Sequence, residues 1–144
     1  MEATHHGPFL ETPCLFIEVG SSKQEWDDDR ACKVIAKTIL ESINSFKQNE
    51  NYKVAIGIGG PHYCPNFNQI QLDNQFAISH IIAEYALPIN KEMIYQAISK
   101  TKEKVKYIII DWKGLGKSEQ RQQTLDVLKD FNLNIIRTSE AKSG

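Results

Sequence analysis

The histidines of this chain lie in two segments that could do acid–base or metal chemistry. His5 and His6 are adjacent near the N-terminus, and His62 follows the apolar run at residues 53–58 in the turn Gly59-Gly60-Pro61-His62-Tyr63-Cys64. Neutral imidazole is the commonest metal ligand in proteins and a general base near neutral pH. In an extended segment neighbouring side chains point to opposite sides, so one of His5 and His6 would face a given site. Both histidines could equally be solvated or structural, because two adjacent histidines are a weak motif.

The glycine turn is the second candidate feature. Gly59 and Gly60 permit backbone angles that other residues avoid, and they let a ligand approach the main chain closely. The spacing fits neither a P-loop nor a dinucleotide-binding fingerprint, so nucleotide-triphosphate chemistry is not indicated. Cys64 in this turn is interpreted as a small apolar side chain rather than a nucleophile, because nothing near it in sequence supplies a base.

The cysteines argue against a cysteine-rich zinc site or a disulfide framework. The chain has three of them, an odd number, at positions 14, 32 and 64. This spacing matches neither a secreted disulfide scaffold nor a zinc knuckle. We therefore expect Cys14, Cys32 and Cys64 to be buried free thiols.

A third patch combines a carboxylate, an aromatic plate and an amine in the segment Asp111-Trp112-Lys113-Gly114. Aromatic side chains stack on unpaired bases and lysines meet phosphates, which is how single-stranded RNA ends are held. The alternative is that Trp112 anchors the loop to the core while Lys113 is solvated. The sequence leaves both readings open.

Composition restricts the possible partners. The chain has 144 residues, with 17 Lys and Arg against 18 Asp and Glu and a formal charge of −1. Such a balance gives no global attraction to nucleic acid, so DNA binding is not expected and any RNA contact must be local. The longest apolar runs are far shorter than the roughly 20 residues of a membrane span. We expect a soluble cytoplasmic protein without membrane contact, and a monomer that could self-associate if an apolar face were exposed.

The elements that must position these residues alternate between strands and helices. Strands are expected at residues 14–19, 53–59, 105–111 and 133–137, and helices at 28–46, 71–85, 90–101 and 118–131. His80 would lie within the second helix as a core histidine. This alternation predicts a single α/β domain over residues 1–144, with a layered sheet flanked by helices. Sites in such sheets gather beyond the carboxyl ends of the strands.

Four motifs together resemble the archaeal-type D-aminoacyl-tRNA deacylase family, in matching order and spacing. They are Glu2-Ala3-Thr4-His5-His6-Gly7-Pro8, Phe16-Ile17-Glu18-Val19-Gly20-Ser21 with Trp26, Gly57-Ile58-Gly59-Gly60-Pro61-His62-Tyr63, and Asp111-Trp112-Lys113-Gly114-Leu115. The resemblance implies a zinc-dependent enzyme that hydrolyses the ester between a D-amino acid and the 3′ end of tRNA. It also implies the α/β fold of phosphorylases and peptidyl-tRNA hydrolases.

The chain departs from the family pattern in two respects. Pro61 stands where the family usually has a third glycine, so the turn lacks one backbone N–H. Family members also carry a substantial region before the first motif, which implies that this chain corresponds to the C-terminal part of the family's chain.

The resemblance and the residue chemistry together assign the candidate site. The expected zinc ligands are His5, His6 and His62, which with Glu18 form the expected catalytic group. The residues expected to contact the aminoacylated 3′ end of tRNA are Gly59, Gly60, Tyr63, Asp111, Trp112 and Lys113. Two alternatives remain, a non-catalytic tRNA-binding fragment and a small metal-dependent hydrolase of another ester.

Overall fold

The computed structural model describes residues 2–3, 10–12, 14–46, 51–73 and 75–142. These residues form two compact units. The larger unit comprises residues 1–13 and 51–144, and the smaller unit comprises residues 14–50. Each unit is described by itself.

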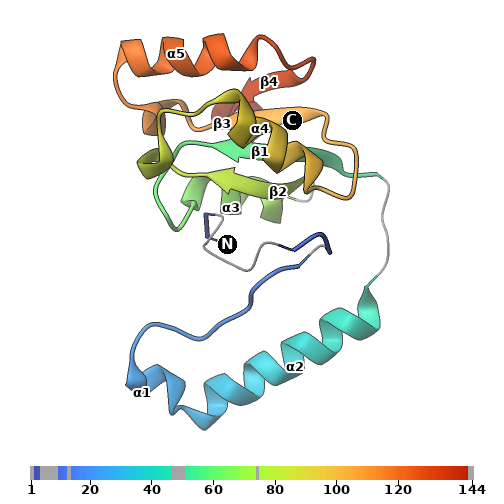
Figure 1. The fold of residues 1–144 in the computed structure, drawn as a ribbon. Coiled ribbons are helices and arrows are strands. Elements are labelled where there is room, and N and C mark those ends of the chain that lie inside the picture. The colour runs from blue at the N-terminus through green and yellow to red at the C-terminus, as the bar shows by residue number, and fades with distance from the viewer. Residues whose placement is uncertain (1, 4–9, 13, 47–50, 74, 143–144) are drawn as a thin grey trace. The chain divides into compact units, whose positions relative to one another are not determined.

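The larger unit is built on a parallel sheet. Its strands are β1 (Lys53–Ile58), β2 (Phe76–Ile82), β3 (Tyr107–Ile110) and β4 (Asn134–Arg137). They are arranged in the order β2-β1-β3-β4, and every neighbouring pair is parallel (Figure 1). The strands expected near residues 53, 105 and 133 are confirmed, and so is the α/β fold class.

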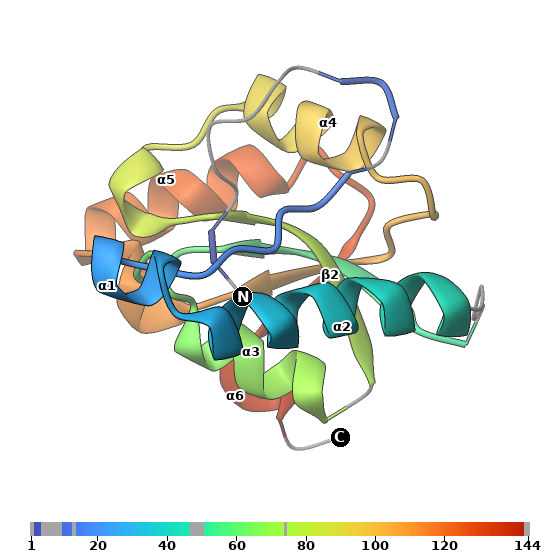
Figure 2. The ribbon, with the colours of Figure 1, turned by 90° about the horizontal axis from the view of Figure 1, so that it is seen from below.

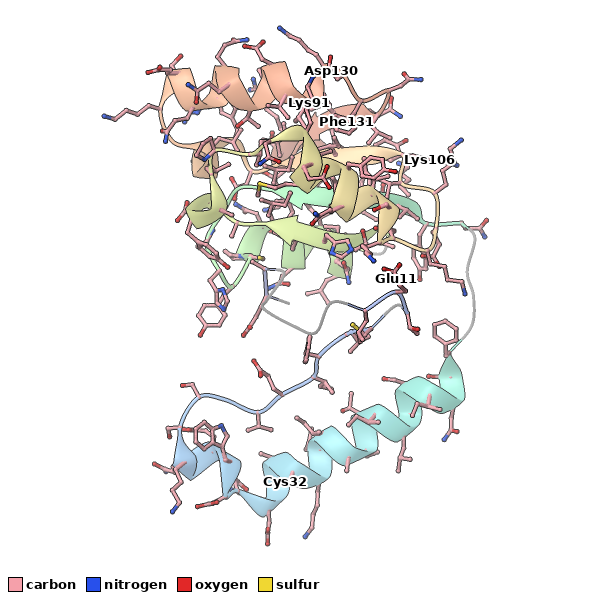
Figure 3. All side chains as sticks on the ribbon, viewed as in Figure 1. Glu11, Cys32, Lys91, Lys106, Asp130 and Phe131 are labelled. Carbon is pink, nitrogen blue, oxygen red and sulfur yellow. The ribbon has the colours of Figure 1, made fainter. Side chains whose placement is uncertain are left out.

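Helices cover both faces of this sheet. On one face α3 (Pro65–Leu72) and α6 (Thr138–Ala141) enclose a core that includes Phe67, Ile78 and Ile109. On the other face α4 (Lys91–Ser99) and α5 (Ser118–Leu128) enclose a second core with Ile56, Ile94 and Leu128 (Figure 2). Lys91 at the start of α4 pairs with Asp130 just after α5 (Figure 3). The expected helices at 90–101 and 118–131 therefore exist, and Asn90 caps α4 by accepting the Met93 N–H at 2.9 Å.

The expected helix at 71–85 is wrong. This segment contains β2, whose pairing with β1 shifts by one residue between Ile78 and Ile81. The bulge places Ile78 and Ile81 on the same buried face although they are three residues apart. Three-residue spacing of apolar side chains is also what a helix shows, so the bulge imitated a helical pattern.

The helix α3, which precedes β2, was not predicted from the sequence. It begins at Pro65, a residue that suits the first helical position because its missing N–H would have no partner inside the helix. The preceding Cys64 adopts a left-handed conformation with φ of 49°. Together they turn the chain sharply from the end of β1 into α3.

The smaller unit contains two helices, α1 (Lys23–Trp26) and α2 (Asp29–Ser45). Asp28 caps α2 by accepting the Arg30 N–H at 2.8 Å, so the expected helix at 28–46 is confirmed. The expected strand at residues 14–19 is wrong, because residues 14–20 belong to no strand and the described part of this unit offers none to pair with. None of the helices described in either unit is long and apolar enough to cross a membrane.

Two linkers between sheet and helices touch through glycines. Gly59 and Gly60 follow β1 with positive φ of 89° and 79°. Gly114 lies in η2 (Trp112–Leu115), a 3-10 turn after β3. A β-carbon on Gly114 would stand 2.2 Å from Gly60 N and 2.6 Å from Gly60 Cα, so only glycine fits there.

Replacing Gly114 by alanine should therefore force the two linkers apart. We expect Gly114→Ala to reduce the free energy of unfolding by about 3 kcal/mol, the upper part of the range for overpacking. Urea unfolding followed by circular dichroism would measure the loss. Gly20→Ala is the control, because a β-carbon at Gly20 meets nothing within 4 Å, and its unfolding should stay within about 0.5 kcal/mol of the parent chain. An equal effect from both substitutions would contradict the close contact.

Candidate functional site

The carboxyl edge of the sheet is held together by backbone hydrogen bonds between three linkers. The Gly59 N–H donates to the Ile82 carbonyl at 2.8 Å, and the Glu84 N–H donates to the Gly60 carbonyl at 2.9 Å. The Asp111 N–H donates to the Ile58 carbonyl at 2.9 Å. The chain leaves β1, β2 and β3 along this edge, where parallel sheets usually carry their sites. The Gly59 N–H is therefore already used in a hydrogen bond to β2, and it helps to hold the linker after β1 in place.

His62 is the centre of one cluster on this edge. Its Nε2 lies 3.4 Å from the Glu2 carboxylate, and its Nδ1 lies 3.3 Å from the Tyr85 hydroxyl. Its carbonyl accepts the Ala3 N–H at 2.8 Å, and Ala3 is buried in the core beside α3. The half-buried imidazole is therefore fixed by residues from the chain start, from the β1 turn and from η1 (Glu84–Ala86).

Two exposed aromatic rings flank this imidazole. Tyr63 meets the His62 ring edge-to-face with centroids 5.0 Å apart, and the Tyr85 ring centroid is 6.2 Å away. The two tyrosines are 65% and 64% exposed. A carboxylate at one ring nitrogen, a phenol at the other and accessible rings beside them suit proton transfer to a ligand that stacks.

Asp111 belongs to a second cluster at the same edge. It is only 5% exposed, and its Oδ2 accepts the Asn66 side-chain N–H at 2.8 Å. The Asn66 oxygen in turn accepts from the Lys142 ammonium at 2.9 Å. These two hydrogen bonds link the end of β3 to α3 and to the residue after α6, so they join the strand end to two helices on one face of the sheet. Contact of Asp111 with tRNA remains a prediction.

Trp112 is half-buried against the core beneath α4 and α5. The guanidinium carbon of Arg137 lies 4.1 Å from its ring centroid, and that of Arg121 lies 5.2 Å away. Lys113 is exposed beside it. The anchoring of Trp112 in the core agrees with the second reading of this loop, while base stacking remains a prediction.

Other candidate residues lie apart from these clusters. His5 and His6 lie outside the described residues. Glu18 is exposed in the irregular segment of the smaller unit, so its catalytic role remains a prediction. His80 lies in β2 rather than in a helix, and its burial lowers its pKa, against a hydrogen bond to the Lys100 backbone that raises it. Its half-buried position in the sheet is compatible with the expected core histidine.

The cysteines differ from one another. Cys14 and Cys32 are exposed, so the expectation of buried thiols is wrong for these two and correct for Cys64. Neither has the core around it that a strand at 14–19 or a buried face of α2 would have supplied. The Cys64 Sγ lies 3.2 Å from the His62 carbonyl, and burial raises its pKa to about 11.

Several site residues had no assignment from sequence. Glu2 lies in the first motif without a spacing that links it to His62, and Tyr85 lies at the end of the segment predicted to be a helix. Asn66 and Lys142 carry no local pattern that marks them, since only the packing of α3 and α6 on one face brings them together.

A metal site is only partly represented in the described residues. No group of three or more His, Cys, Asp or Glu side chains that could hold a metal occurs among them. His62 Nε2 and Glu2 Oε2 are donors of the types that zinc takes, and they lie close together. Further ligands would have to come from outside the described residues, where His5 and His6 lie.

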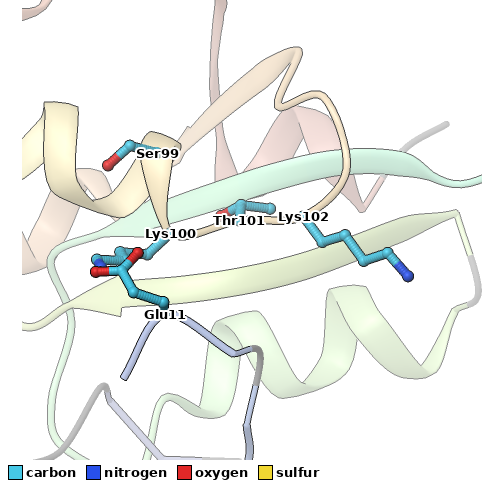
Figure 4. Close-up of a pocket in the computed structure, with 5 residues that line it drawn as sticks. All are labelled: Glu11, Ser99, Lys100, Thr101 and Lys102. Carbon is cyan, nitrogen blue, oxygen red and sulfur yellow. The ribbon is translucent and has the colours of Figure 1, made fainter. Parts of the chain in front are cut away.

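A shallow pocket lies elsewhere, at the end of α4 (Figure 4). It has a volume of about 280 Å³ and is lined by Glu11, Ser99, Lys100, Thr101 and Lys102. Lys100 pairs with Glu11 across it. Since α4 ends where the chain turns back toward the start of β3, this pocket is not on the edge that carries His62.

Comparison with known proteins identifies the family. The family model described as D-aminoacyl-tRNA deacylase matches residues 1–136. The chain belongs to this family. Similar curated proteins named D-aminoacyl-tRNA deacylase come from Pyrococcus furiosus, 46% identical over 94% of this chain, and Thermococcus kodakarensis, 45% identical over 94%. The matches cover 49% and 50% of those two proteins, so the chain spans about half of their length.

A solved structure shares the fold. The crystal structure of a conserved protein of unknown function superimposes with a TM-score of 0.85 and 31% sequence identity, covering 99% of this chain and 50% of the other. The family model, which matches residues 1–136, covers nearly all of the chain, in agreement with the four sequence motifs.

The buried thiol of this deacylase-family chain should resist alkylation. We expect iodoacetamide at pH 8 to label Cys14 and Cys32 and to leave Cys64 unmodified, because the thiol is enclosed and its high pKa leaves little thiolate. Peptide mass spectrometry of the native protein would show the sites, with a urea-unfolded sample as the control in which all three react. Rapid labelling of Cys64 in the native protein would contradict its burial.

The Asn66 bridge should contribute to stability. Asn66→Ala removes the donor to buried Asp111 and the acceptor of Lys142, so we expect a loss of about 1–3 kcal/mol in the free energy of unfolding. Gln69→Ala on the exposed side of the same helix should change it by less than about 0.5 kcal/mol. Equal urea midpoints for the two variants would show that the Asn66 bridge does not contribute to the free energy of unfolding.

Proposed function

We propose that this chain provides the hydrolytic centre for D-aminoacyl-tRNA, cleaving the ester between a D-amino acid and the tRNA 3′ end. The observation that carries the proposal is the position of His62, between the Glu2 carboxylate and the Tyr85 hydroxyl at the carboxyl edge of the sheet. The names of the relatives, which have this substrate and reaction, support it. Aminoacyl-tRNA is made and used in the cytoplasm, so that is where the chain would act.

The geometry suggests how His62 would act. Glu2 at Nε2 favours the tautomer in which this nitrogen carries the proton, and Nδ1 then serves as the acceptor beside the Tyr85 hydroxyl. In the proposed reaction His62 takes a proton from a water molecule whose oxygen bonds to the ester carbonyl carbon. The bond from that carbon to the ribose oxygen then breaks, and the imidazolium returns the proton to the ribose oxygen.

Zinc is proposed as the cofactor of an alternative arrangement, in which His62 and either His5 or His6 would be ligands. His62 would then not be the base, and a carboxylate would take the proton from water. When bound, zinc would polarise the ester carbonyl and lower the pKa of a water molecule toward about 7. The close approach of Glu2 to His62 suits this assignment, because a carboxylate that receives the second N–H of a histidine or shares its metal is a common companion of such sites. Glu18 is retained as a further candidate carboxylate.

Three of the residues predicted to contact the tRNA end are assigned to the substrate. Tyr63 would stack on the terminal base, since its ring is exposed beside His62. Gly60, whose positive φ of 79° favours glycine, would let the ester approach the main chain of the turn. Lys113, exposed on the neighbouring linker, would face the negative charge that develops on the carbonyl oxygen.

Replacing His62 should abolish hydrolysis without unfolding the chain. We expect His62→Ala to slow release of D-tyrosine from D-Tyr-tRNA by roughly 10²–10⁴-fold, the usual range for a general base. Tyr85→Phe, which removes only the hydroxyl at Nδ1, should cost less, about tenfold. The control His80→Gln changes a histidine of β2 outside the cluster and should keep the parent rate.

The assay also tests substrate and metal. D-Tyr-tRNA and L-Tyr-tRNA would be compared after chelation, with and without added zinc. Zinc-dependent release from the D-form alone is the expected result. Binding of tRNA without release from either form would refute the hydrolytic assignment, and a fully active His62→Ala variant would remove His62 from it.

A further inference from the structure

Two arginines meet at one aromatic ring on the β4 side of the sheet. Arg137 is the last residue of β4, and Arg121 lies in α5. Their guanidinium carbons stand 4.1 Å and 5.2 Å from the centroid of Trp112. A guanidinium that stacks on an aromatic face gives up little further freedom when its N–H groups bind an acceptor.

Neither guanidinium has an acidic partner in the part of the chain that is described. The ion pairs found among the described residues join other side chains. Arg121 Nε is buried without any hydrogen-bond partner. The positive charge of the two guanidiniums is therefore not offset by a carboxylate among the described residues.

An open pocket adjoins Arg137 and Trp112. It has a volume of about 290 Å³, and its lining includes Trp112, Arg137, Ile135, Leu125 and Glu140. The Glu140 carboxylate accepts the Arg137 backbone N–H at 2.6 Å, so it is bound to the start of α6. Arg137 is exposed, and its strand is the outermost in the described sheet, so a large ligand can reach it.

We infer that Arg121 and Arg137, held on Trp112, form a binding site for a phosphodiester group of the tRNA substrate. The inference rests on the proposed function and adds a backbone contact to it. The site lies where β3 and β4 end, on the same sheet edge as His62 at the end of β1. Arginine forks match two phosphate oxygens at once, whereas lysines act as point charges.

The test is tRNA binding by the 144-residue chain and its variants, measured by fluorescence anisotropy of labelled uncharged tRNA at several salt concentrations. We expect Arg137→Ala to weaken binding about tenfold and to reduce the slope of log K against log salt by about one phosphate contact. Arg137→Lys keeps the charge but loses the forked guanidinium, so its affinity for tRNA should lie between those of the parent chain and Arg137→Ala. Because Arg137 is exposed, these substitutions leave the core intact, and thermal unfolding would verify this.

The control is Lys106→Ala, which removes one exposed charge at the opposite, amino end of β3 (Figure 3). Its binding should remain within about twofold of the parent chain. An equal loss in Lys106→Ala and Arg137→Ala would mean that only net charge matters and would overturn the site. Inorganic phosphate would also be added as a competitor, with a chloride solution of equal ionic strength as the control. If phosphate displaced tRNA more strongly than chloride did, the two arginines would be assigned to free phosphate instead.

The deacylation assay separates failure of this inference from failure of the proposed function. Hydrolysis of D-Tyr-tRNA together with unchanged tRNA binding in Arg137→Ala would overturn the phosphate site alone. Weakened binding in Arg137→Ala together with absent hydrolysis would overturn the hydrolytic function and support the site. Absence of tRNA binding by the parent chain would overturn both.

Discussion

The backbones of the linkers after β1 and β3 touch at Gly60 and Gly114, with no room for a β-carbon between them. This contact fixes the positions of the two linkers relative to each other where the chain leaves β1 and β3. On one side of it the turn carries His62 outward, and on the other Asp111 fills the space behind Gly60, where a β-carbon would stand 3.0 Å from its carboxylate. The position of each functional side chain on this edge thus depends on the absence of side chains at the point of contact.

Strand order divides the edge by chemistry. Near the ends of β1 and β2 lie His62, Glu2 and Tyr85, which can accept and donate protons. Beyond the ends of β3 and β4 lie Arg121 and Arg137, which carry positive charge without a carboxylate partner in the described residues. An aminoacylated RNA end needs both kinds of group, because its ester must be attacked while its phosphates must be held. A parallel sheet supplies them side by side, since all its strands end at one edge.

The sequence predicted three of the four strands in the described sheet, and three of its four expected helices exist. Continuous apolar strands such as β3 are recognisable because both of their faces are covered. β2 was mistaken for a helix because its bulge gives Ile78 and Ile81 a helical spacing, and only the pairing with β1 reveals the inserted residue. The apolar residues at 14–19 have strand propensity but no strand beside them in the smaller unit, and propensity alone forms no sheet.

The sequence predicted which candidate residues lie on this edge, but it did not predict which side chains they contact. Parallel topology puts the residues after β1 and β3 on one edge, so His62, Asp111 and Trp112 could be named from spacing. Which side chains they contact depends on where the chain start, α3 and α6 pack, and no local pattern encodes that. Trp112 shows the consequence: its residue type suggests a plate for a base, but Arg137 already lies over the ring. In the proposed phosphate site the ring would therefore act by orienting the charge of Arg137 rather than by stacking on a base.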